Sequence, residues 1–128
     1  MVLKKRKILS IDDSSTARLM IKNGVDATVY ELLEAGDGQE GLNVLAQSYQ
    51  EIALILLDWS MPGMNGLEFL SIVKNDRRYR DIPVMVVTTE SEKDSIIKAI
   101  KLGAVNYLLK PFDKEELRRK ITACLTIK

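Results

Sequence analysis

Acidic residues follow two of the apolar runs in the chain. Asp12 and Asp13 come directly after Ile11, and Asp58 comes directly after Leu57. Three carboxylates that converge on one cleft repel one another, so at least one pKa rises unless a cation is present. Carboxylates, a backbone carbonyl and retained waters are the ligands that magnesium takes in proteins. The acids therefore predict a Mg2+ site.

Polar residues also follow the two apolar runs nearest the C-terminus. They are Thr88, Thr89 and Glu90 after residues 84–87, and Lys110 after residues 105–109. A carboxylate beside a divalent metal and a fixed ammonium is a poor base but a usable nucleophile toward phosphorus. The metal and the ammonium neutralise the oxygens of the transferring phosphoryl group. The set favours phosphoryl transfer onto an aspartate, which is a recognised covalent chemistry.

Short apolar runs alternate with amphipathic stretches and must position these side chains. The runs are residues 7–11, 28–33, 53–57, 84–87 and 105–109. Runs of this kind are typical of strands that helices cover on both faces. Helical stripes separate them: Ala17, Met20, Ile21 and Gly24; Leu42, Leu45 and Ala46; Leu67, Leu70 and Val73; Ile96, Ile97, Ile100 and Ala104; Leu117, Ile121, Cys124 and Leu125. The alternation predicts an α/β fold of five βα units around a parallel sheet.

Capping signals agree with these helices. An acid follows a capping residue by three positions in three pairs, which are Asp37 with Glu40, Ser91 with Asp94, and Asp113 with Glu116. In an open parallel sheet, ligands bind beyond the carboxyl ends of the strands. The polar residues described above all fall at that end, so we expect one site there.

Composition restricts the kinds of partner. The 128 residues suit a single domain spanning 1–128, and 19 basic against 18 acidic residues give no general attraction to nucleic acid or membrane. Cys124 has no second cysteine with which to form a disulfide. Without histidine, any metal must be a hard ion bound by oxygen. The longest apolar run, residues 52–57, is too short to span a bilayer, so we expect a cytoplasmic protein without membrane insertion.

Four segments resemble the receiver domains of response regulators in two-component signalling. They are residues 8–13, 56–66, 86–90 and 109–112, in order and each at a predicted strand end. The resemblance covers essentially the whole chain. It implies a doubly wound, flavodoxin-like (βα)5 fold with strand order 2-1-3-4-5, and it favours the stand-alone chemotaxis type of receiver.

The resemblance also implies roles for the site residues. Asp58 would accept the phosphoryl group. Asp13, Asp58 and the main-chain carbonyl of Ser60 would bind Mg2+, and Asp12 would bind it through water. Lys110 would pair with the phosphoryl group and Thr88 would donate its hydroxyl to it.

Three further positions concern control. Tyr107 stands at the family's switch position, and Ser60 and Glu90 stand where the family tunes dephosphorylation. The bond between Lys110 and Pro111 would be cis. Thr89 departs from the alanine or glycine of many members, and a β-branched residue beside the acceptor would narrow access for small phosphodonors or phosphatases.

The resemblance implies a signalling phosphoacceptor rather than an enzyme. A histidine kinase or a histidine phosphotransfer protein would supply the phosphoryl group, and a downstream protein would bind the surface of the fourth helix, fifth strand and fifth helix. The helix-turn-helix pattern of DNA-binding regulators is absent, so no nucleic acid partner is expected.

Other interpretations stay open at this point. An aspartyl phosphohydrolase usually needs a second acid two residues after its nucleophile, where this chain has Ser60. A flavin or nucleotide binder would need a phosphate-binding loop in place of Asp12 and Asp13. A receiver-like scaffold that is never phosphorylated also remains. On the simplest structural interpretation, Asp12 and Asp13 cap a helix, Asp58 lies in a turn and Tyr107 only packs.

Overall fold

The computed structural model describes residues 5–89 and 93–126. The strands are β1 (Arg6–Ile11), β2 (Tyr30–Ala35), β3 (Ile52–Asp58), β4 (Val84–Thr89) and β5 (Asn106–Lys110). The α-helices are α1 (Ser15–Gly24), α2 (Gly38–Ser48), α3 (Gly66–Asn75), α4 (Lys93–Leu102) and α5 (Lys114–Thr126), and a 3-10 turn, η1 (Tyr49–Glu51), precedes β3. The predicted alternation of strands and helices is confirmed.

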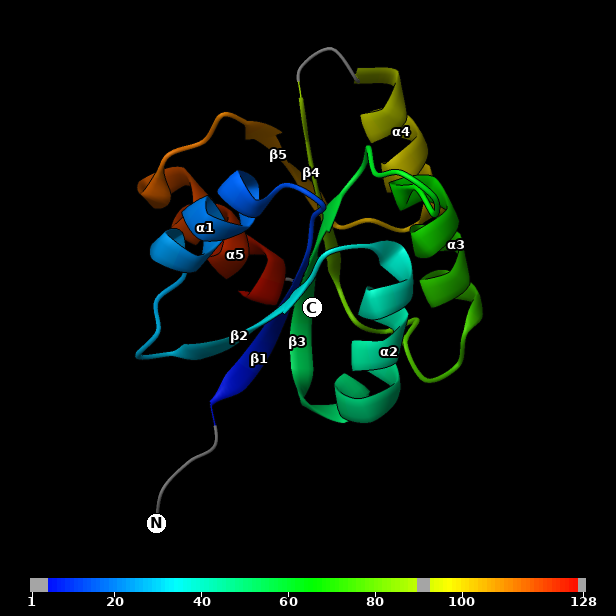
Figure 1. Cartoon of the computed structure of the whole chain (residues 1–128), viewed down its shortest axis with the longest axis horizontal. Helices are drawn as coiled ribbons and strands as arrows, with labels where there is room; N and C mark the ends of the chain where they lie inside the picture. The colour runs from blue at the N-terminus through cyan, green and yellow to red at the C-terminus, as the bar shows by residue number, and fades with distance from the viewer. Residues whose placement is uncertain (1–4, 90–92, 127–128) are drawn as a thin grey trace.

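The five strands form one parallel sheet in the order β2-β1-β3-β4-β5 (Figure 1). The chain starts next to one edge, adds β2 there, and then crosses back over β1 to build β3, β4 and β5. This order confirms the topology that the family resemblance implied. Its consequence is that the ends of β1 and β3 lie side by side at the centre of the sheet.

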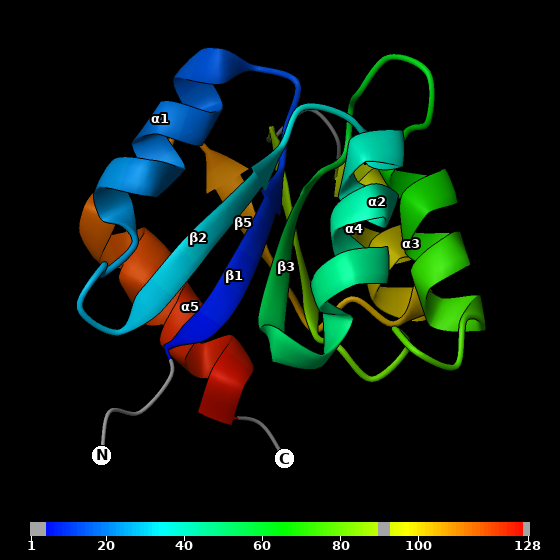
Figure 2. The same ribbon diagram turned by 60° about the horizontal axis from the view of Figure 1, so that its bottom comes forward.

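Helices cover both faces of the sheet (Figure 2). Each face has its own hydrophobic core. Alternate residues of a strand point to opposite faces. In β1, Leu9 and Ile11 therefore pack toward α2, α3 and α4, whereas Ile8 packs with Ile21 of α1 and Leu117 of α5. The inner strands β3 and β4 are almost fully buried, as their continuous aliphatic sequences predict.

The second strand begins later than the sequence pattern predicts. The Asp26 carboxylate accepts hydrogen bonds from the backbone N–H and the hydroxyl of Thr28, which holds that residue in a turn. The strand then runs to Ala35, which is buried. The shift places the end of β2 beside the end of β1, where Asp12 N–H donates to the Ala35 carbonyl at 3.0 Å.

The predicted caps at Asp37 and Asp113 are confirmed. Each carboxylate accepts a hydrogen bond from a backbone N–H three residues on, at 2.8 Å from Glu40 and 2.7 Å from Glu116. The predicted cap at Ser91 lies outside the described residues. Such caps satisfy amide groups that have no partner within the helix.

The predicted helical stripes are only partly buried. Five of their members are exposed: Met20, Ala46, Leu67, Ile97 and Ile100. Each helix contacts the sheet through a narrower line of residues, so apolar side chains at its flanks face solvent. In α3 the predicted Leu70 and Val73 are buried, but Phe69 is buried in place of Leu67. In α4 the buried core residue is Ala99.

Candidate functional site

The predicted site residues meet at the carboxyl ends of the strands. Asp12 follows β1, Asp58 is the last residue of β3, Thr88 lies near the end of β4, and Lys110 is the last residue of β5. We call the group formed by Asp12, Asp13, Asp58 and Lys110 the acidic pocket. Its members come from parts of the chain up to 98 residues apart, and the fold brings them into contact.

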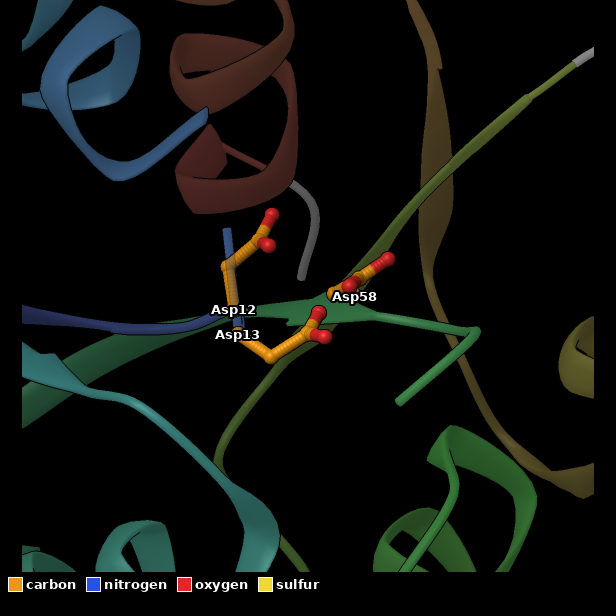
Figure 3. A group of neighbouring side chains, drawn as sticks. All are labelled: Asp12, Asp13 and Asp58. Carbon is orange, nitrogen blue, oxygen red and sulfur yellow. The ribbon is translucent and has the colours of Figure 1, made fainter. Parts of the chain in front are cut away.

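Three carboxylates gather in the acidic pocket (Figure 3). One oxygen from each of Asp12, Asp13 and Asp58 lies within 4.8 Å of the others. Asp12 is 1% exposed and Asp58 6% exposed, whereas Asp13 faces solvent. Two buried acids and one exposed acid leave the cluster open on one side, and a hard cation with retained waters fits such a set of oxygen donors.

Lys110 provides positive charge inside the pocket. Its ammonium donates to Asp12 Oδ2 at 3.0 Å and to Asp58 Oδ1 at 3.4 Å. Burial alone would lower the pKa of Lys110, but its hydrogen bonds and charge interactions with both aspartates raise it. The lysine therefore stays charged, and one ammonium faces three carboxylates.

The surroundings of the Asp58 carboxyl group disfavour its ionised form. Burial, then the charge of Asp12 and a hydrogen bond with Asp13, raise its pKa to about 7, although Lys110 opposes the shift. The sequence argument that one of the three pKa values must rise is thus supported. A divalent cation among the same oxygens would favour the ionised form of Asp58.

Asp12 is fixed by the backbone around it. Its Oδ1 accepts from the N–H of Ser14 at 2.9 Å, and its carbonyl accepts from the Arg18 guanidinium at 2.6 Å. Ser14, not an aspartate, caps α1 by accepting from the N–H of Ala17. The capping interpretation of Asp12 and Asp13 is therefore wrong for this helix, which leaves both carboxylates for the pocket.

Arg18 was not singled out from the sequence. Besides the Asp12 carbonyl, its side chain lies 3.7 Å from a Glu34 carboxylate oxygen of β2. The spacing of Asp12 and Arg18 carries no motif by itself, because an arginine in a first helical turn more often faces solvent. Only the turn between β1 and α1 shows that it reaches back to the pocket.

The loop after β3 is held against the end of the strand. The Gly66 N–H donates to the Trp59 carbonyl at 2.9 Å, and a Cβ at Gly66 would lie only 2.7 Å from the Trp59 Cα. Asn65 and Glu68 then form a capping box that starts α3. Glycine is thus required where α3 begins, so that helix and acceptor strand can approach closely.

The remaining predicted residues border the pocket or lie beyond it. Thr88 is buried and Ser60 exposed. Ser60 lines an open cavity of about 620 Å3 that also includes Trp59 and Lys98. Tyr107 is 36% exposed. Glu90 lies outside the described residues, and the bond between Lys110 and Pro111 is cis, as expected.

Comparison with known proteins agrees with this geometry. Residues 8–122 match the family model of the response regulator receiver domain. The chain belongs to that family. As a receiver it is a signalling protein, and its order of strands is the one found in receiver structures.

Within the receiver family, the chain is similar to chemotaxis proteins. It is 40% identical to a chemotaxis protein CheY homolog of Campylobacter jejuni over 90% of its own length and 88% of the relative's. It is 40% identical to chemotaxis protein CheY1 of Helicobacter pylori, covering 93% and 96% of the two chains. The crystallised chemotaxis protein CheY4 of Vibrio cholerae superposes with a TM-score of 0.87 at 30% identity, covering 95% of this chain and all of that one.

Within the described ranges, 5–89 and 93–126, no helix has the length and apolar character needed to cross a membrane.

Proposed function

We propose that this chain is a phosphorylation-controlled signalling module, a single receiver domain over residues 1–128, whose acceptor is Asp58. A histidine kinase or histidine phosphotransfer protein of the cytoplasm supplies the phosphoryl group. The observation that carries the proposal is the buried Asp58 carboxylate with a lysine ammonium at 3.4 Å and two further carboxylates beside it. No simple capping or packing role accounts for that arrangement.

Magnesium is the cofactor that fits this donor set. Asp13, Asp58 and the Ser60 carbonyl would hold it, with Asp12 acting through water. Bound there, it would supply positive charge that offsets the negative charge on the phosphoryl oxygens. The three carboxylates and the raised pKa of Asp58 support a divalent ion, because one lysine does not balance the negative charge.

The chain's own residues then divide the chemistry. An ionised oxygen of Asp58 forms the new bond to phosphorus while the bond to the donor nitrogen breaks, and that electron pair stays with the departing imidazole. Lys110 moves from Asp58 toward the phosphoryl oxygens, and Thr88 donates its hydroxyl to another of them. Ser60 borders the path of the water that later hydrolyses the acyl phosphate. Glu90 lies outside the described residues, and its role rests on the family resemblance: both residues would set the lifetime of the acyl phosphate.

Output follows from the same threonine. When the Thr88 hydroxyl turns toward the phosphoryl group, it vacates space into which the Tyr107 ring can rotate. Residue pairing supports this path: Thr88 lies beside Leu109, and Tyr107, two residues earlier, points to the same face of the sheet. The ring then leaves the α4–β5–α5 face, which we define by Ile96, Ile100 and Tyr107, and a downstream protein binds the altered surface.

The test is phosphate uptake measured as intact mass after incubation with acetyl phosphate and Mg2+. Asp58→Asn should take up none, whereas Asp81→Asn, an exposed aspartate before β4, should behave as the parent chain does. Equal uptake by Asp58→Asn would exclude Asp58 as the acceptor. In the same assay, Ser60 and Glu90 variants should change the lifetime of the phosphorylated form but not its formation.

A further inference from the structure

Lys120 of α5 contacts Tyr107, although it belongs neither to the acidic pocket nor to either hydrophobic core. Its ammonium donates to the Tyr107 carbonyl at 2.7 Å and lies 4.2 Å from the centre of the Tyr107 ring. It also lies 3.5 Å from Asn106 Oδ1, which itself accepts from the Tyr107 N–H at 2.8 Å. The Lys120 ammonium thus contacts both the main-chain carbonyl and the aromatic ring of Tyr107.

The position of the ring gives this contact a direction. Tyr107 pairs with Val86, so its side chain leaves β5 on the face covered by α3 and α4. Lys120 belongs to α5, which packs on the opposite face with Leu117 and Ile121. The two meet at the free edge of β5, where the ring is exposed. The cation therefore stabilises the outward orientation of Tyr107.

Rotation of the ring would separate the two kinds of contact. The hydrogen bond to the carbonyl stays in place, because the backbone of β5 is paired with β4. The contact between the ammonium and the ring would be lost if the ring turned toward Thr88, because Thr88 lies on the face covered by α3 and α4, whereas Lys120 comes from α5 on the opposite face. Lys120 consequently interacts with one ring orientation better than with the other, and only such a difference can shift a population.

We propose that Lys120 is a positioning residue that holds Tyr107 outward and thereby limits how often the unphosphorylated chain adopts the partner-binding surface. The proposal rests on the switch described under the proposed function and adds the element that opposes it. Removing an exposed cation–ring contact should raise the inward population roughly two- to fivefold.

The experiment uses the full chain labelled with 3-fluorotyrosine, and 19F NMR reads the Tyr107 ring. Tyr107→Phe identifies its signal among the four tyrosines. Lys120→Met keeps the aliphatic stem and removes the charge, so the inward population should rise without any phosphoryl mimic. Lys120→Arg should restore the parent distribution, and Lys114→Met, an exposed lysine on the same helix, should leave it unchanged. Unfolding curves identify any variant that is merely less stable.

Two results separate this inference from the proposed function. If Lys120→Met leaves the Tyr107 signal unchanged while beryllofluoride still moves it, Lys120 does not hold the ring and the proposed switch stands. If beryllofluoride never moves the signal but Lys120→Met does, the ring contact is real and the proposed switch is wrong. A shift in Lys120→Met that Lys120→Arg fails to reverse would also overturn the charge-based role.

Discussion

The acidic pocket and the α4–β5–α5 face differ in what holds them. In the pocket, two buried carboxylates share one lysine, and the charges do not balance. On the face, Ile100 and Tyr107 are exposed to solvent, and the ammonium of half-buried Lys120 lies over the Tyr107 ring. Under the proposed switch, the strong interactions of the acidic pocket would bias the weaker contacts of the Tyr107 ring, since a small difference in free energy is enough to shift a population.

The largest expected effect is the loss of stability when Asp58 ionises while buried beside Asp12. Its folded pKa of about 7 exceeds the unfolded value of 3.8, so the folded chain binds more protons between these values. Without divalent metal, the free energy of unfolding should fall as the pH rises from 4 to 7, by at most on the order of 4 kcal/mol. Urea titrations at several pH values measure this.

Asp58→Asn supplies the control for that dependence. The amide cannot ionise, so the variant should be more stable than the parent at pH 8 without metal and should gain less from Mg2+. A parent chain whose stability rises between pH 4 and 7 would contradict the charge conflict in the pocket.

Removal of the Lys110 charge should lower the free energy of unfolding, whereas Asp58→Asn should raise it. Lys110→Met leaves Asp12 and Asp58 buried without their cation and should cost about 3 kcal/mol in metal-free buffer. Lys7→Met is the matched control, because its pair with Glu51 at the other end of the sheet is partly exposed and should contribute less than about 1 kcal/mol. Similar losses of stability in Lys110→Met and Lys7→Met would show that Lys110 stabilises the fold no more than a partly exposed ion pair does.

A third change tests the support of the pocket rather than its charges. In Gly66→Ala the new methyl group would press on the Trp59 backbone, which should cost about 2 kcal/mol and slow phosphate uptake. Gly63→Ala has open space but a backbone φ of 72°, so it should lose about 1 kcal/mol and take up phosphate normally. Trp59 fluorescence should move only in the first variant.

The smallest effect on stability is expected on the α4–β5–α5 face. Ile100 is 45% exposed, so Ile100→Ser should change the free energy of unfolding by less than about 0.5 kcal/mol. Binding of the downstream partner should nevertheless weaken. Ile72→Ser on α3, also exposed, is the control, and an equal loss of binding in both would mean that the partner uses another surface.

The sequence predicts best what depends on regular patterns. Continuous aliphatic runs locate the strands. Because the carboxyl ends of parallel strands lie at the same end of the sheet, the sequence predicts that Asp12, Asp58 and Lys110 meet there. The start of β2 was missed because a side-chain turn at Asp26 competes with the strand. Ile97 and Ile100 are exposed, although the helical periodicity of the sequence predicts them in the core. Periodicity does not distinguish an apolar side chain that is buried from one at the flank of the apolar stripe that faces solvent.

Contacts between side chains and elements distant in the chain could not be predicted from the sequence. Lys120 reaches Tyr107 only because α5 crosses beside the free edge of β5, and no spacing within the chain encodes that crossing. Arg18 reaches the Asp12 carbonyl through a turn whose shape depends on Ser14. In both cases the residue type is ordinary for a helix surface, and its partner is a backbone carbonyl, which every residue possesses.

The separation of 98 residues between Asp12 and Lys110 has a consequence for the synthesis of the protein. Contacts this distant in sequence form late, because the entropy of closing a long loop must be overcome first. A nascent chain that has not yet released β5 from the ribosome contains Asp58 but lacks the ammonium beside it. Under the proposed function, competence for phosphorylation should therefore arise only with the completed sheet, so that an unfinished or partly unfolded copy would not transmit a signal.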